Sequence, residues 1–144
     1  MTAHASAPPA GLLRRLAACF YDGLLLLALW MVGTALWLPF TGGEAIPEHL
    51  HFAHQFYLTV ITVAFFVGFW RIAGQTLGMR AWHLRVEQQD GRLITLPQAL
   101  MRCAVAVLSW AAFGLGYLWI LIDRERRSWH DIASGTRVVR RPRR

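Results

Sequence analysis

One acidic side chain, Asp22, lies inside a long apolar stretch of the sequence. If that stretch crosses a membrane, a carboxylate there costs roughly 2.5–3.5 kcal/mol, so Asp22 needs a partner or a role. Arg15 precedes it by seven residues, on nearly the same face of a helix, and Arg102 heads a later apolar stretch. Two interpretations stay open: a buried ion pair that fixes helix packing, and a titrating site that carries a proton or binds a cation.

Histidines are the other candidates for chemistry. His51 and His54 are three residues apart, a spacing that suits two metal ligands on one helix. Solvated histidines at a membrane interface are the simpler interpretation, so both stay weak metal candidates. His130 and Asp131 are adjacent and could form an acid–base pair, but no nucleophile or recognisable pocket accompanies them. The sequence therefore predicts no enzyme, no cofactor and no firm metal site.

The elements that hold these residues are apolar helices of membrane length. The chain has 144 residues, of which 56% are hydrophobic and only 16% are charged. A soluble domain of this size cannot bury so much apolar surface, so lipid is the expected solvent. Residues 16–38 form the first expected span, which is long enough to cross about 30 Å of hydrocarbon. Residues 50–73 form the second.

A third apolar stretch, residues 98–122, has two possible structures. It is long enough for a single span, but the pair Gly114 and Gly116 could instead break it into a re-entrant hairpin. All fifteen basic residues are arginines, and the connector between the first two spans contains none. The positive-inside rule therefore places the N-terminus in the cytoplasm.

That rule also bears on the third stretch. A single third span would carry the C-terminal arginines outside, against the rule, so the broken form and a cytoplasmic C-terminus are favoured. The C-terminal arginines are eight: Arg124, Arg126, Arg127, Arg137, Arg140, Arg141, Arg143 and Arg144.

Short elements complete the prediction. Residues 1–13 are expected to form a flexible tail, residues 14–141 the membrane domain, and residues 142–144 a basic tail. Alternating residues on both sides of Asp90-Gly91 predict a β-hairpin over about 83–95, and Thr136–Arg140 could add a third strand. The predicted fold is a mainly α, polytopic membrane protein: two spanning helices, a third apolar element and a small cytoplasmic β-hairpin.

Four sequence blocks together resemble one family. They are RRLAACFYDGLLL at the first span, GQTLGMRAWHLRV before the Asp-Gly turn, QALMR before the third apolar stretch, and DRERRSWHDIASGTRVV near the end. Over about residues 11–140 the chain resembles the RDD family of bacterial membrane proteins, named for one arginine and two aspartates. The resemblance implies that Arg15 and Asp22 are the arginine and the first aspartate. Asp131 fits the second aspartate best, with Asp123 as the other choice.

The resemblance implies a location in the bacterial inner membrane, and it leaves two hypotheses for function. The first is transport of a small ligand or ion, because sodium(lithium)/proton antiport is attributed to some members. Asp22 would then titrate, tuned by Arg15 or Arg102, in a homo-oligomer that encloses the pathway. The alternative is a non-catalytic anchor or a regulatory assembly module that binds partner proteins or anionic lipid. Nucleic acid is not an expected partner, because the arginines flank apolar runs instead of forming one stripe.

Overall fold

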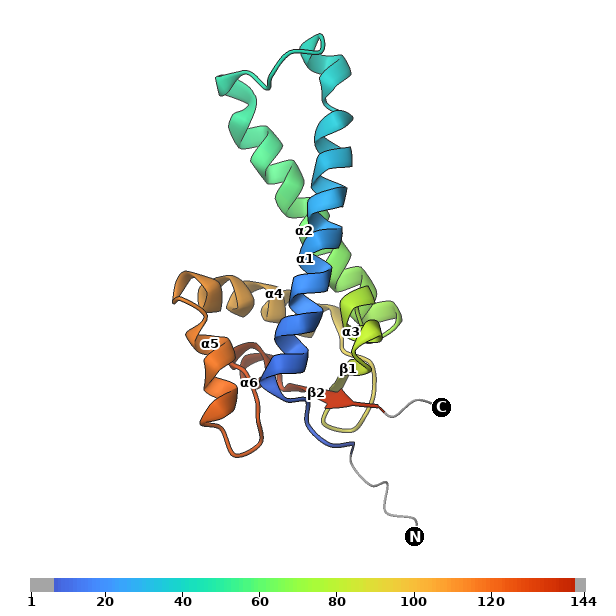
Figure 1. The fold of residues 1–144 in the computed structure, drawn as a ribbon, viewed down its shortest axis with the longest axis vertical. Coiled ribbons are helices and arrows are strands. Elements are labelled where there is room, and N and C mark those ends of the chain that lie inside the picture. The colour runs from blue at the N-terminus through green and yellow to red at the C-terminus, as the bar shows by residue number, and fades with distance from the viewer. Residues whose placement is uncertain (1–6, 142–144) are drawn as a thin grey trace.

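Two long helices lean apart above a broader base of short elements (Figure 1). The computed structural model describes residues 7–141. Helix α1 (Leu12–Ala35) and helix α2 (His51–Ile72) are connected through two 3-10 turns, Leu38–Thr41 and Glu48–Leu50. By length and composition both helices can cross a membrane. The two predicted spans are therefore confirmed as membrane-length helices.

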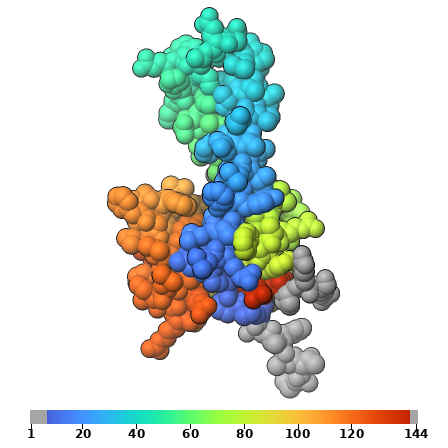
Figure 2. All heavy atoms as spheres, in the orientation of Figure 1, coloured from blue at the N-terminus to red at the C-terminus, as the bar shows by residue number. Residues whose placement is uncertain are grey.

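The base flanks the lower part of α1 on both sides, while the upper parts of α1 and α2 stand free of it (Figure 2). Its core packs apolar side chains from α1, α2 and the short elements, including Ala18, Trp70, Val86 and Val138. The elements of the base are α3 (Leu77–Ala81), β1 (Leu84–Gln88), α4 (Leu96–Ala111), α5 (Leu115–Leu118), the 3-10 turn Trp119–Leu121, α6 (Trp129–Ser134) and β2 (Thr136–Arg140).

The third apolar stretch is broken, as one of the two predicted forms requires. Helix α4 ends at Ala111, and α5 with the following 3-10 turn leaves at an angle of 105°. Phe113 and Gly114 have φ angles of 56° and 77°, and two consecutive left-handed residues end a right-handed helix. The alternative of one unbroken helix across residues 98–122 is therefore wrong. A Cβ on Gly116 would collide with the Ser109 hydroxyl, so this glycine lets α5 fold back against α4.

The small sheet exists, but its pairing differs from the predicted hairpin. Strand β1 pairs antiparallel with β2, and Val86 lies opposite Val138. The chain does turn at Asp90-Gly91, where the Gln88 N–H donates to the Arg92 carbonyl at 2.9 Å. Two competing structures prevent a local second strand. On β1 the Val86 N–H donates to the Gly74 carbonyl at 2.6 Å, and Thr95 already caps α4 in a capping box.

The two ends of the described chain lie side by side. Pro9 forms a β-bridge with Val139, and the Ala10 N–H donates to the Val138 carbonyl at 3.1 Å. Ala10 is almost completely buried. Residues 8–10 thus extend the edge of the sheet, which differs from the flexible tail predicted for residues 1–13. Residues 1–6 and the predicted basic tail, residues 142–144, lie outside the described residues.

Candidate functional site

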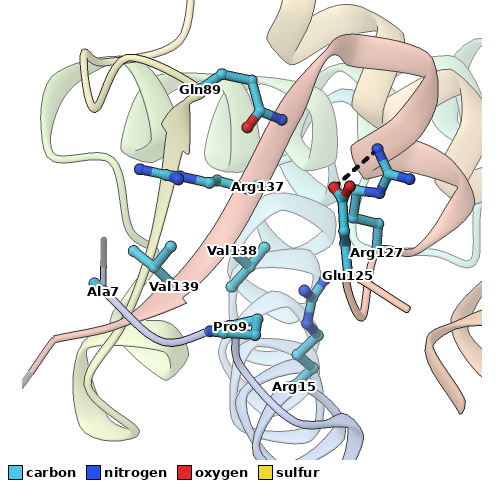
Figure 3. A pocket seen from close by; sticks show the side chains of 9 residues that line it. All are labelled: Ala7, Pro9, Arg15, Gln89, Glu125, Arg127, Arg137, Val138 and Val139. Atoms are coloured by element: carbon cyan, nitrogen blue, oxygen red, sulfur yellow. Dashed lines mark ion pairs between the residues drawn. The ribbon is translucent and has the colours of Figure 1, made fainter. Parts of the chain in front are cut away.

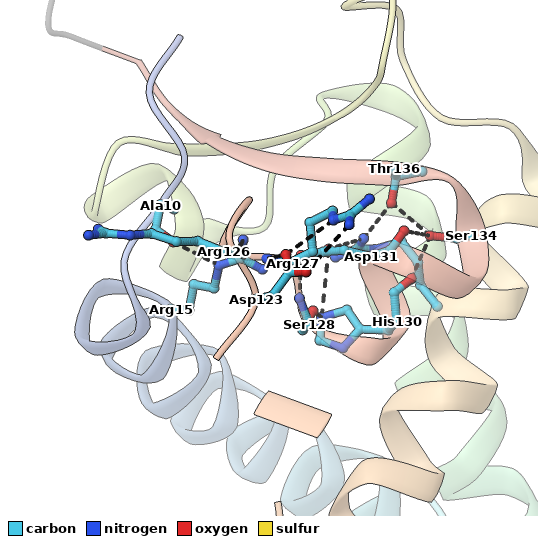
Figure 4. Close-up of polar contacts among 11 residues, drawn as sticks. Ala10, Arg15, Asp123, Arg126, Arg127, Ser128, His130, Asp131, Ser134 and Thr136 are labelled. Carbon is cyan, nitrogen blue, oxygen red and sulfur yellow. Dashed lines mark hydrogen bonds and ion pairs between the residues drawn. The ribbon is translucent and has the colours of Figure 1, made fainter. Parts of the chain in front are cut away.

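Asp131 is the centre of a buried charged cluster in the base (Figure 4). Its side chain is completely buried. One carboxylate oxygen, Oδ2, accepts from the Arg15 guanidinium of α1, and the other, Oδ1, accepts from Arg102 Nη1 of α4 at 2.6 Å. Asp131 itself belongs to α6. This one carboxylate therefore joins three helices that are far apart in the sequence, and we call Arg15, Arg102 and Asp131 the charged hub.

The sequence around Asp131 explains its position. Ser128 is the N-cap of α6, and Asp131 is the third helical residue, so the two form a capping box. The Ser128 N–H donates to Asp131 Oδ2 at 3.2 Å, which fixes the carboxylate at the start of the helix. Gly135, with a φ angle of 64°, ends α6 and lets the chain turn directly into β2.

Both arginines of the hub have further partners within the chain. Arg15 donates from Nε to the Ala10 carbonyl at 3.2 Å and from Nη2 to the Arg126 carbonyl at 3.0 Å. Arg102 donates from Nη1 to Thr136 Oγ1 at 2.6 Å, and its guanidinium carbon lies 5.1 Å from the centre of the Trp70 ring. Contacts with several acceptors at once, and stacking on an aromatic ring, suit arginine better than lysine. The hub therefore also ties the N-terminal segment, the loop before α6 and β2 together.

Burial and the charges of the hub together shift the pKa values of Asp131 and His130. Burial would raise the pKa of Asp131, but Arg15 and Arg102 outweigh it and hold that pKa well below its ordinary range. Burial, helped by Arg102, lowers the pKa of His130 to about 3. The His130 ring is therefore neutral near pH 7, and its Nε2 shares a hydrogen bond of 3.0 Å with Ser128 Oγ. The nearest Asp131 oxygen is 4.0 Å from that nitrogen, so the two do not form the acid–base pair considered from the sequence.

Asp22 is buried as predicted, but its partners are different. It accepts hydrogen bonds from the Thr76 hydroxyl and from the Gly78 N–H, the latter at 2.8 Å. Among residues 7–141 no salt bridge reaches Asp22, because both candidate arginines bind Asp131. Of the two interpretations left open by the sequence, the ion pair of Asp22 with Arg15 or Arg102 is therefore not formed.

Helix α3 explains why Asp22 binds Thr76 and Gly78 and not an arginine. Thr76 is its N-cap and accepts from the Met79 N–H at 3.2 Å, so Asp22 meets the positive end of a short helix. A Cβ on Gly78 would collide with the Ala18 carbonyl, so this glycine allows α3 to approach α1. The signal available in the sequence was Thr76 followed by Leu77 and Gly78, a helix start that can receive a carboxylate.

The remaining predicted site residues lie outside the hub. Asp123 accepts from the Arg127 N–H at 2.9 Å and from its guanidinium at 3.2 Å, and these contacts lower the pKa of Asp123. A hydrogen bond of 2.8 Å joins His51 to the Ile46 carbonyl, and one of 3.1 Å joins His54 to Thr34 Oγ1. Within the described part of the chain no group of three histidine, cysteine or acidic side chains could hold a metal ion.

Among the hollows formed by residues 7–141, two are relevant here. One, of about 210 Å³, lies at the base beside Arg15, Arg127 and Arg137 (Figure 3). Each of these arginines is already paired with a carboxylate: Asp131 for Arg15, Asp123 and Glu125 for Arg127, and Glu87 for Arg137. The other is an apolar groove near the far end of α1, which we call the upper groove. It is lined by Trp30, Met31, Thr34, Ala35, Leu38 and Leu58.

The sequence model of the RDD family matches residues 9–135. The chain belongs to the RDD family. Over 76 residues it is 33% identical to the "Uncharacterized protein YckC" of Bacillus subtilis (strain 168), an alignment that covers 49% of each chain. The chain thus spans about half the length of this curated relative, and no solved structure matches it. It is an RDD membrane protein, and in its fold Arg15 pairs with Asp131, while Asp22 binds α3.

Proposed function

We propose that this RDD protein is a non-catalytic membrane module that assembles with other membrane segments. The observation that carries the proposal is that groups of the chain itself bind the buried carboxylates of Asp131 and Asp22. Asp131 accepts from two arginines, and Asp22 accepts from Thr76 and Gly78. Neither carboxylate lines the two hollows described above. These charges therefore fasten the base together and leave the surface of the long helices for contact with partners.

The same proposal includes an orientation, with α1 and α2 crossing the bilayer and the base at its cytoplasmic face. It is supported by the pairing of Pro9 with Val139, which requires both ends of the described chain to lie on one side. It is also supported by charge. Residues 36–50 contain no arginine and two glutamates, whereas arginines flank the lower ends of both helices and recur throughout the base. Such a basic surface attracts anionic headgroups by about 1 kcal/mol per residue.

The surface for assembly is the upper groove. Above the base, α1 and α2 expose large apolar side chains, and Trp30 and Met31 line the groove between them. In a bilayer this surface contacts either lipid or another helix, and close packing is what drives helices together there. The simplest partner is a second copy of this chain, which would give the homo-oligomer expected from the sequence.

Self-association in liposomes tests this proposal. Donor- and acceptor-labelled copies are reconstituted together and diluted with lipid. We expect energy transfer that persists on dilution and is lost in Ala35→Trp, which fills the upper groove. Ala28→Trp is the matched control, because Ala28 is an exposed alanine of the same helix outside the groove. Transfer that vanishes on dilution of the wild type, or that both variants retain equally, contradicts assembly through the groove.

A second candidate, cation/proton exchange, is favoured by one observation. Asp22 lies on a membrane-length helix, and its described hydrogen-bond donors, the Thr76 hydroxyl and the Gly78 N–H, are both neutral. A buried carboxylate on a membrane-length helix, without an opposite charge beside it, is the kind of group that can bind a proton or a cation during transport. Exchange would still require an oligomer, because two crossing helices do not enclose a pathway.

Exchange is measured in the same liposomes with a pH-sensitive dye and a sodium gradient. The module hypothesis predicts no exchange above empty liposomes, for the wild type or for Asp22→Asn. Exchange that depends on Asp22 would replace the module hypothesis with the second candidate.

A further inference from the structure

Helix α4 buries its polar face and exposes its apolar face. The side of α4 that faces the base buries Ala99, Arg102 and Ser109. The side that faces outward exposes Met101, Val107, Leu108 and Trp110. In a helix on a water-soluble protein the polar face points outward. Here the arginine points inward to Asp131 and the apolar face points outward, so the surroundings of α4 must be apolar.

The apolar surface of α4 continues to the bend between α4 and α5, where Phe113 lies. Phe113 is 95% exposed, more than any other large hydrophobic residue of the described chain. Its φ angle of 56° is rare for a bulky residue and is held by the adjoining left-handed Gly114. From Cys103 to Ile122 the sequence has no charged residue. The corner between the two helices therefore presents a large aromatic ring with apolar surface on both sides of it.

We infer that the corner around Phe113 inserts into the hydrocarbon of the leaflet nearest the base, without crossing to the other leaflet. The occupant of this surface is the acyl chains of lipid. The exposed surface of the lower part of α1, with Leu16, Phe20 and Leu24, is also apolar, and α4–α5 lies beside it in Figure 2. The lipid that surrounds α1 thus continues around the corner.

Length excludes a crossing by the second limb. From Leu115 to Leu121 the limb has seven residues, which reach about 10 Å as a helix, against about 30 Å of hydrocarbon. The chain then returns to α6 and β2 in the base, where β2 pairs with the N-terminal segment. The stretch therefore enters and leaves the same leaflet. This inference rests on the membrane orientation proposed above.

Spin-label accessibility tests the corner directly. Single cysteines at Phe113, Val60 and Arg124 are labelled in a Cys19→Ala, Cys103→Ala background of the full chain in liposomes, after circular dichroism has confirmed its helix content. Collision rates are measured with oxygen, which concentrates in lipid, and with a water-soluble nickel chelate. We expect Phe113 to match Val60 of α2, with oxygen collisions dominant, and Arg124 of the base to show the reverse.

The outcomes separate the inference from the orientation on which it rests. Nickel collisions at Phe113 equal to those at Arg124 overturn the inserted corner, provided that Val60 remains in lipid. Low collision rates with both reagents at Phe113 also overturn it, because protein would then cover the corner. Nickel access at Val60 overturns the orientation itself. If the background variant does not fold, a photo-crosslinking residue at position 113 of the wild-type background answers the same question: lipid adducts support the inference, and protein adducts overturn it.

Discussion

Asp131 binds the guanidinium of Arg15, a residue 116 positions earlier in the chain, and this contact fastens the start of the first long helix to the end of the fold. Arg102 completes the hub from α4. Because all three side chains are almost completely buried, each charge depends on the others for compensation.

Removing the carboxylate of Asp131 should therefore destabilise the fold strongly. Asp131→Asn leaves two buried guanidinium groups without an opposite charge, and we expect the free energy of unfolding to fall by roughly 3–5 kcal/mol. Unfolding in mixed micelles by added denaturing detergent measures this. Asp123→Asn is the control, since Asp123 pairs with Arg127 nearer the surface and should change stability little. Equal effects of the two variants would contradict the hub.

Acid should destabilise the fold through His130. Burial lowers the pKa of His130 from 6.5 to about 3. Between these two pH values His130 is protonated in the unfolded chain but neutral in the folded chain. Stability should then fall as the pH drops from 6.5 towards 3, by at most about 1.4 kcal/mol per pH unit. Asp131, whose pKa is lowered from 3.8, adds its own loss only below that value.

Thermal unfolding at several pH values measures this slope. His130→Gln should flatten the curve between pH 6.5 and 4, whereas His49→Gln, at an exposed position, should leave it unchanged. A slope that survives in His130→Gln would show that another group binds the proton.

The contact between α1 and α3 depends on a missing side chain. Gly78→Ala places a methyl group against the Ala18 carbonyl, and we expect it to cost about 1–3 kcal/mol by overpacking. Gly23→Ala is the control, because a Cβ there meets nothing within 4 Å and should stabilise the helix slightly. Hydrogen exchange of residues 76–82 should speed up only in Gly78→Ala. Unchanged exchange there would mean that α3 is not held by Asp22.

The pairing of the two strands can be tested by exchanging charges. Glu87 lies opposite Arg137 and binds its guanidinium at 2.9 Å. Glu87→Arg should lower stability by about 1–3 kcal/mol, and adding Arg137→Glu should recover part of the loss. The exposed pair Asp90–Arg92, exchanged in the same way, should have little effect. No recovery in the double variant would indicate that β1 pairs elsewhere.

The long helices and the break could be predicted from the sequence because they depend on local properties. Apolar length gives α1 and α2, and glycine content together with the count of C-terminal arginines indicates a broken third stretch. The pairing of strands could not be predicted in the same way. Asp90-Gly91 forms its turn, but whether β1 binds its neighbour or a strand 50 residues away is decided by burial in the base.

For the site, too, the sequence identified the residues but not their partners. The sequence identified Arg15, Arg102, Asp22 and Asp131 as the charges that need partners, because each lies in or beside an apolar segment. It offered Arg15, which shares a helix face with Asp22, and Arg102 as candidate partners of Asp22. In the fold, however, Arg15 points into the base, and the short helix α3 supplies hydrogen-bond donors to Asp22. The capping role of Thr76 was the local signal that could have found this partner.

A double-mutant cycle on Arg15 tests the central claim most directly. The stabilities of Arg15→Met, Asp131→Asn and the double variant give the coupling energy between the two residues, and the same cycle with Asp22→Asn gives the alternative pairing. The charged hub predicts a coupling of about 2–3 kcal/mol between Arg15 and Asp131 and almost none between Arg15 and Asp22. The reverse result, with Arg15 coupled to Asp22 and not to Asp131, would contradict the account.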